Sequence, residues 1–311
     1  MTKYVKVNMK KIFRILRNLF AIIGVLFVGF WAFLELSPAV YYHFDIEPST
    51  TGLCKKNIGK LRHAGNFQAD TLSFSLRIVQ DSARAEEIRN YFQLDTLYAA
   101  DAPTWDKALA IGQFVATHIP HDNQRIWPDS VDAIGLWEYT QNVAPAFNCR
   151  LHSVMAFELF LATGIIARFA TCLPEDEHDN DCHVVNEVWL PEQSKWAMID
   201  TDMGGHYVTS MEGTPLSLKE MRDNYIAGTD MMLYPGFKNG HSKHDYYYAY
   251  MAKNTYWFAC WGELSYYQEN YKHEEVVRDH YIELVPSGFT PFGSVSGQTV
   301  TSDADWFWAA P

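Results

Sequence analysis

The chain lacks the excess of basic residues that nucleic-acid binding requires. It has 37 acidic and 25 basic residues and a formal net charge of −12. Acidic residues are absent from residues 1–17, which carry six lysines and arginines, so the rest of the chain is more acidic still. Because phosphate binding needs a basic face, nucleic acid is excluded as the main partner.

Internal repeats and low-complexity tracts are also absent, which excludes a repeat architecture. Hydrophobic residues make up 48% of the chain and aromatic residues 15%. This composition is typical of a folded protein rather than a disordered one. The 311 residues suffice for one large domain or two small ones with ample core.

Charged residues are missing from the run LFAIIGVLFVGFWAFL at 19–34, directly after the basic start. The run is slightly short for a membrane span of about 20 residues, and aromatic and leucine neighbours extend it. We therefore predict a basic cytoplasmic leader over residues 1–17 and a signal-anchor transmembrane helix over 18–36. The positive-inside rule then places the rest of the chain outside the cytoplasm, in the periplasm or at the cell surface. A cleaved signal peptide is the alternative.

Cysteines are few and odd in number, with five in the chain. The stretch EDEHDNDCH combines His178, Cys182 and His183 with several acids, which makes a metal site a candidate. It lacks a second cysteine or histidine pair at zinc spacing. We therefore predict no metal and no other cofactor. If one cysteine is a working thiol, the remaining four are enough for two disulfides.

Cys149 opens the apolar run AFNCRLHSVMAFELFLATGI at 146–165. The run has helical spacing, because its apolar residues recur at steps of three and four. Asn148 occupies the position of a helix N-cap, which places Cys149 in the first turn. Unpaired N–H groups and the positive end of the helix dipole favour a thiolate there. A buried structural cysteine is the competing interpretation.

Three strands follow this helix, because the sequence changes to period two over 167–172, 183–190 and 195–200. If the PEQS turn closes a hairpin, Leu190 lies opposite Lys195. This register places the side chains of His183, Asp200 and Asp202 on one face, within reach of one another. A histidine between carboxylates is suited to act as the general base for a cysteine nucleophile. A cysteine helix followed by an antiparallel sheet predicts the α+β class.

Upstream segments add further helices. We predict a strand over 71–79 and helices over 82–92, 102–119 and about 130–141. The aromatic-rich region from about residue 240 is expected to supply more strands or to cover the core.

These segments resemble the transglutaminase-like superfamily, above all its exported bacterial members. The resemblance rests on FNCRLHS, GIIARFATCLP, DCHVVNEVWLPEQSKWAMID and GTPLSLKEMRDNYIAG. It implies a papain-like α+β core, with Cys149 as nucleophile, His183 as base and Asp200 as the orienting acid. The family commonly has Asp-Pro-Thr after the third strand where this chain has DTDMGG, so Asp202 stays a candidate for the orienting role.

The resemblance also suggests a division of the chain beyond the membrane helix. We expect a lead-in over 37–84, a transglutaminase-like core over 85–230 and an aromatic-rich extension of the same domain over 231–311. The function expected of this domain is hydrolysis of a peptide or amide bond, with a peptide or protein as the substrate. An amine-accepting acyl transferase that cross-links proteins is one alternative, and a non-catalytic envelope binding module is another.

Two features of the site are predicted from the residues alone. The N–H of Cys149 is one oxyanion donor by geometry, and Gln141 and Trp137 are candidates for the second. Cys172 ends one strand and Cys182 precedes the next, so a hairpin would bring them together and permit a disulfide.

Overall fold

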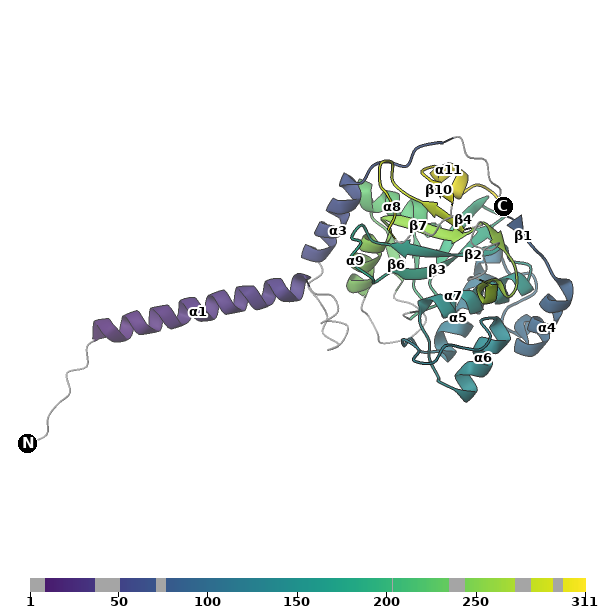
Figure 1. The fold of residues 1–311 in the computed structure, drawn as a ribbon, viewed down its shortest axis with the longest axis horizontal. Coiled ribbons are helices and arrows are strands. Elements are labelled where there is room, and N and C mark those ends of the chain that lie inside the picture. Colours follow the sequence, from purple (N-terminus) through teal and green to yellow (C-terminus); the bar gives the residue numbers. More distant parts are fainter. Residues whose placement is uncertain are drawn as a thin grey trace, which may run out of the picture. The chain divides into compact units, whose positions relative to one another are not determined.

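The computed structural model describes residues 9–36, 51–70, 77–202, 204–234, 244–271, 281–292 and 299–311. The chain divides into two compact units, Met1–Lys55 and Lys56–Pro311. The first unit contains helix α1, Met9–Leu36, and the start of helix α3, Thr51–His63 (Figure 1).

Helix α1 is mostly apolar. Its segment Phe13–Phe33 spans 21 residues with a mean hydropathy of 2.0, and none of it is buried. It is therefore long and apolar enough to cross a membrane, and it is compatible with a membrane anchor or a signal sequence. The helix begins earlier than the predicted span of 18–36, because it includes part of the basic leader.

The second unit is built on one eight-stranded sheet with the order β10-β9-β7-β2-β3-β4-β5-β6. Its pairs are antiparallel except for β9 and β10, which run parallel. The strands, in chain order, are β2 (Ala167–Leu173), β3 (His183–Leu190), β4 (Lys195–Ile199), β5 (Tyr207–Thr209), β6 (Met232–Tyr234), β7 (Trp257–Trp261), β9 (Tyr281–Leu284) and β10 (Thr299–Thr301). Strands β1 (Arg77–Ile78) and β8 (Glu263–Leu264) form a separate parallel pair.

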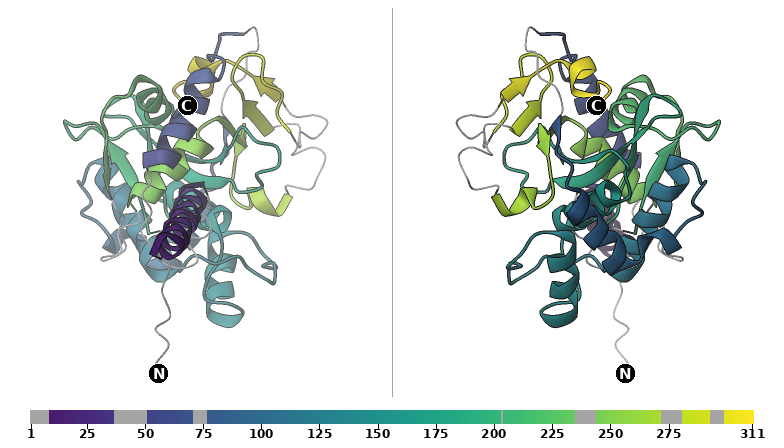
Figure 2. Two further views of the ribbon diagram at one scale, coloured as in Figure 1. Left: turned by 90° about the vertical axis from the view of Figure 1, so that its left-hand side faces the viewer. Right: turned by 90° about the vertical axis from the view of Figure 1, so that its right-hand side faces the viewer.

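Helices cover both faces of this sheet. One core contains α4 (Ser82–Phe92), α5 (Thr104–His118), α6 (Ala133–Asn142) and α7 (Cys149–Ala162). The opposite core contains α8 (Leu218–Ala227), α9 (His244–Asn254) and α11 (Ala304–Phe307). Figure 2 shows the helices of the first core, in blue and teal, gathered in the lower half of the unit. Short 3₁₀ turns at Leu94–Thr96 and Gln268–Tyr271 complete the described elements.

The central strands alternate between the two cores, which is why they read as period two in the sequence. In β2, Phe169 packs with the α4–α7 core and Cys172 with the opposite core. In β4, Ala197 and Met198 divide in the same way. The mixed α and β architecture with a mainly antiparallel sheet confirms the predicted α+β class.

The hairpin between β3 and β4 has the predicted register. Leu190 pairs with Lys195, and the pairing continues to Asn186 opposite Ile199. The PEQS turn is short, and Ser194 in it adopts a positive φ of 51°. This register places the first residue of β3 and the residue after β4 at the same end of the sheet.

The predicted disulfide between Cys172 and Cys182 is not formed, and both residues are free thiols. In the β2–β3 pair, Cys172 lies opposite His183 rather than Cys182. A shift of one residue turns a side chain to the other face of a sheet, so the two thiols do not face each other. Burial also raises the pKa of both thiols.

Long-range pairing completes the sheet. Strand β7 lies between β2 and β9, so the aromatic-rich region after residue 240 supplies strands as well as helix α9. Of the strand predicted over 71–79, residues 71–76 lie outside the described residues and β1 covers only Arg77–Ile78. The helices predicted over 82–92, 102–119 and about 130–141 are confirmed as α4, α5 and α6, within three residues at their ends.

Glu158 ties the buried helix α7 to its neighbours. Its carboxylate accepts hydrogen bonds from the backbone N–H groups of Ala133, at 2.9 Å, and Tyr267, at 2.7 Å. Arg84 lies 3.9 Å away. Burial raises the pKa of Glu158 to about 7, although these hydrogen bonds and Arg84 oppose the shift.

We predict that this carboxyl makes the protein less stable as the pH rises from about 5 to about 7.5. The folded state retains the Glu158 proton in a range where the unfolded state has lost it, so unfolding becomes easier as the pH increases. Glu158→Gln removes this titration. The free energy of unfolding of the variant minus that of wild type, measured by denaturant titration, should therefore increase as the pH rises across this range. Glu212→Gln, at an exposed turn residue, is the control, and a difference that does not change with pH would contradict the prediction.

Candidate active site

Cys149 is the first residue of helix α7, as the sequence predicts. The side chain of Asn148 caps the helix by accepting a hydrogen bond from the N–H of Leu151 at 3.3 Å. The other N–H groups of the first turn have no partner within the helix. Cys149 is only half-buried, so its thiol lies at the positive end of the helix dipole and is open to a reactant.

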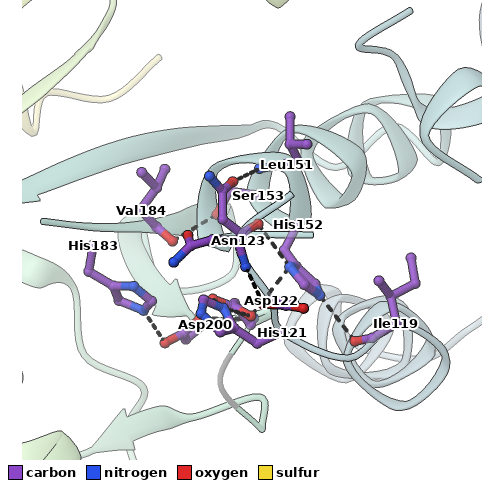
Figure 3. A network of polar contacts seen from close by, with 12 residues as sticks. Ile119, His121, Asp122, Asn123, Leu151, His152, Ser153, His183, Val184 and Asp200 are labelled. Carbon is purple, nitrogen blue, oxygen red and sulfur yellow. Dashed lines mark hydrogen bonds and ion pairs between the residues drawn. The ribbon is translucent and has the colours of Figure 1, made fainter. Parts of the chain in front are cut away.

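A buried hydrogen bond joins His183 to Asp200. Nε2 of His183, the first residue of β3, donates to Oδ2 of Asp200 at 2.6 Å (Figure 3). Both side chains are almost fully buried. Because Nε2 is occupied, Nδ1 is the ring nitrogen left to face another group.

The thiol of Cys149 lies next to this pair. Sγ of Cys149, a ring nitrogen of His183 and a carboxylate oxygen of Asp202 all lie within 4.8 Å of one another. Burial lowers the pKa of His183, but the charge and hydrogen bond of Asp200, with those of Cys149, raise it well above its usual range. The contact with Asp200 therefore favours the imidazolium form of His183 beside the thiol.

Asp202 has different partners from Asp200, although the hairpin places both near His183. Its carboxylate accepts from Nδ1 of His121 at 2.7 Å and lies 3.3 Å from Nδ1 of His152. Burial raises the pKa of Asp202, but the charges of these two histidines and of His183 lower it to about 2. Its own N–H donates to Oδ1 of Asp200 at 2.9 Å, so Asp202 supports the acid that His183 contacts.

Two histidines of this network were not predicted from the sequence. His152 is fully buried, and its ring nitrogens face the carbonyl of Asn148 at 3.0 Å and that of Ile119 at 3.1 Å (Figure 3). His121 is partly exposed, and Asp202 raises its pKa although burial lowers it. The spacing of His152, three residues after Cys149 and hence on the same side of the helix, is the signal that could have found it.

Hydrogen bonds fix helix α7 against strand β3. The hydroxyl of Ser153 donates to the carbonyl of Val184 at 2.9 Å, and the Asn186 amide donates to the carbonyl of Ser153 at 2.9 Å. Thr201 donates to the Asn186 carbonyl oxygen at 3.3 Å. These contacts set the position of Cys149 relative to His183.

Helix α9 closes the other side of His183. The rings of Tyr247 and Tyr250 lie edge-on to the imidazole, with centroids 6.2 and 5.6 Å away. The hydroxyl of Tyr250 lies within hydrogen-bond distance of both Oδ1 of Asp181 and the carbonyl of Cys182. These contacts position the chain just before His183. These tyrosines, like Trp257 and Phe258 of β7, are buried, so they are core residues rather than a binding surface.

The two predicted oxyanion candidates, Trp137 and Gln141, both lie on helix α6. Trp137 packs against Phe92 and Phe114 in the core of the helices, and Gln141 is exposed and donates to Thr140. The side-chain oxygen of Gln124 accepts from the N–H of Asn148, the residue before Cys149, at 3.2 Å. Its amide group therefore lies beside the start of α7. No motif in the sequence pointed to this residue.

Comparison with known proteins gives one family match. Residues 93–201 match the model of the transglutaminase-like superfamily. No curated protein matches the sequence. Among solved structures, the chain is similar to a "putative cysteine protease" from Cytophaga hutchinsonii, at 14% identity and a TM-score of 0.31. That match covers 51% of this chain and 59% of the other, which is less than two thirds of its length.

We predict that Asp200→Asn slows alkylation of Cys149 by iodoacetamide at least about tenfold at neutral pH. A neutral partner no longer holds the proton on His183, so the imidazolium beside the thiol is lost. Asp202→Asn should cause no comparable loss, because Asp202 bonds to His121 instead. Peptide mass spectrometry gives the rate at each cysteine.

Buried Cys172 and Cys260, whose pKa values are raised, serve as internal controls in the same samples. A larger loss from Asp202→Asn than from Asp200→Asn would move the orienting role to Asp202.

Proposed function

We propose that this chain is a thiol enzyme that cleaves a peptide or amide bond through an acyl-enzyme on Cys149. The match of residues 93–201 to the transglutaminase-like superfamily model supports the proposal. The observation that carries the proposal is the arrangement of three groups. Cys149 begins a helix, His183 lies within reach of its thiol, and Asp200 holds the far side of the imidazole. This is the nucleophile, base and orienting acid that acyl transfer requires.

In the first half of the reaction, the thiolate of Cys149 attacks the substrate carbonyl. A C–S bond forms and the carbonyl electrons move to oxygen. The N–H of Cys149 and the amide of Gln124 are the donors proposed for this oxyanion, since both lie at the start of α7. The C–N bond then breaks, and Nδ1 of the His183 imidazolium gives its proton to the leaving amine.

The second half releases the acyl group. Nδ1 of His183, now neutral, takes a proton from a water molecule, which attacks the acyl carbon and displaces the thiolate. Asp200 stabilises the imidazolium that forms again, because its carboxylate stays bonded to Nε2. An amine that enters instead of water would give a new amide, so hydrolysis and transfer share every residue of the site.

We predict that a library of amide and peptide substrates, quenched with acid during turnover, yields an acyl adduct on Cys149. Intact-mass and peptide mass spectrometry identify the adduct and its site. Cys149→Ala should give none, and Cys182→Ala, at another cysteine near the site, should behave as wild type. Absence of an adduct in every case, with Cys149 unreactive to iodoacetamide, would overturn the thiol mechanism.

The same experiment separates the two acyl acceptors. With a labelled primary amine present, a hydrolase releases only the free acid, whereas an acyl transferase incorporates the label. We propose hydrolysis of a peptide or protein substrate, so incorporation of the amine as the main product would favour the cross-linking alternative.

We propose that the domain from residue 56 onward acts outside the cytoplasm and is held at the membrane by α1. Support comes from the basic start of the chain and the apolar, exposed helix that follows. Protease is added to cells whose outer membrane or cell wall is permeabilised and whose inner membrane is intact. Under these conditions it should digest this domain. A domain that stays intact under these conditions, while a known external protein is digested, would contradict the proposed topology.

A further inference from the structure

We propose that Cys149, His183 and Asp202 form a zinc site that holds the thiol enzyme in a reversibly inhibited state. The three residues come from different segments: the start of α7, the start of β3 and the loop after β4. Their donor atoms all lie within 4.8 Å of one another. Ligand atoms around a tetrahedral zinc lie about 3.3–3.8 Å apart, so closure by about 1 Å completes the site.

The donor set suits zinc. A thiolate, an imidazole nitrogen and a carboxylate oxygen are the three ligand types that zinc accepts, and three protein ligands leave a fourth position for water. Cys149 is half-buried, whereas His183 and Asp202 are about 1% exposed, so the ion would enter from the side of the thiol.

The hydrogen bonds that orient zinc ligands are already present at this site. A zinc-bound histidine usually donates its other N–H to a carboxylate, and Nε2 of His183 donates to Asp200 at 2.6 Å. This bond leaves Nδ1 to bind the metal. Ligating carboxylates are in turn held by hydrogen bonds, and Asp202 accepts from His121 at 2.7 Å.

Charge favours a divalent ion at the same place. The Sγ of Cys149 and a carboxylate oxygen of Asp202 lie within 4.8 Å of each other, and both groups bind zinc as anions. A divalent ion between them compensates both negative charges, and Cys149 and His183 release their protons to solvent as the metal binds.

Zinc and catalysis are then mutually exclusive. The sulfur lone pair that attacks the substrate and the Nδ1 that carries its proton are both used by the metal. The inhibition rests on the proposed function, whereas zinc binding itself does not. Asp202 thus becomes the residue that distinguishes the metal site from the hydrolytic one.

The test measures zinc binding by the purified full-length chain in detergent, using equilibrium dialysis with ZnCl₂ alone. We expect one more zinc bound per wild-type chain than per Cys149→Ala chain. Asp202→Asn should weaken this site at least about tenfold, as loss of a ligand or its support does. Asp122→Asn, at an exposed acid of the neighbouring loop, should leave it unchanged.

Protection of Cys149 provides a readout that needs no substrate. Zinc should slow alkylation of Cys149 in wild type at least about tenfold and a chelator should restore it, with a much weaker effect in Asp202→Asn. Equal zinc binding by wild type and Cys149→Ala would overturn the proposal, even if Asp202→Asn does not fold. Protection that is the same in folded Asp202→Asn would overturn it as well, since the acid would then not be a ligand.

The acyl-enzyme assay separates this proposal from the proposed function. An acyl adduct on Cys149 without zinc binding would overturn only the metal site. Zinc binding at Cys149 without an adduct, with Cys149 of the zinc-free chain unreactive to iodoacetamide, would overturn the thiol mechanism and with it the inhibitory role, but not the metal site. Turnover that rises with zinc and disappears with a chelator would overturn the inhibitory role.

Discussion

The buried hydrogen bond between His183 and Asp200 is the contact on which the rest of the site depends. Its 2.6 Å length requires both side chains at one end of the β3–β4 hairpin, and the hairpin register fixes that position. The same bond decides which nitrogen of His183 faces the thiol. Helix α7 then has only to bring Cys149 to that nitrogen, and Ser153 and Asn186 hold the helix there.

Burying so many ionisable groups requires that their charges compensate one another. Asp200 is matched by His183, while Asp202 is matched by His121 and His152. An isolated carboxylate in such a place would be strongly disfavoured, so each acid depends on its histidine partners. Asp202 of the DTD segment is thus a second acid near His183, while Asp200 keeps its bond to His183. This is possible because His121 and His152 compensate the charge of Asp202.

A contact of this structure can be predicted from the sequence when the residues that make it lie close together along the chain. The Cys149 helix start and the β3–β4 register were predictable, because an N-cap, a short turn and alternation of apolar residues are local signals. The prediction of a disulfide was wrong because Cys172 pairs with His183 rather than with Cys182, an offset of one residue between β2 and β3. The connection between these two strands is longer than a tight turn, so it does not fix their register. The insertion of β7 beside β2 and the approach of Gln124 to Asn148 depend on folding of distant segments, for which no local pattern exists.

The residues of the site come from two kinds of segment, the packed core and the connecting loops. The buried helix and the central strands position Cys149, His183 and Asp200, and their packing leaves little freedom to change these residues. The residues around them come from connections: His121 and Gln124 from the loop after α5, and Asp202 from the loop after β4. Loops tolerate change better than a packed core does. A chain with this core can therefore acquire a new charge, an oxyanion donor or a metal ligand beside the thiol while the bond between His183 and Asp200 stays as it is.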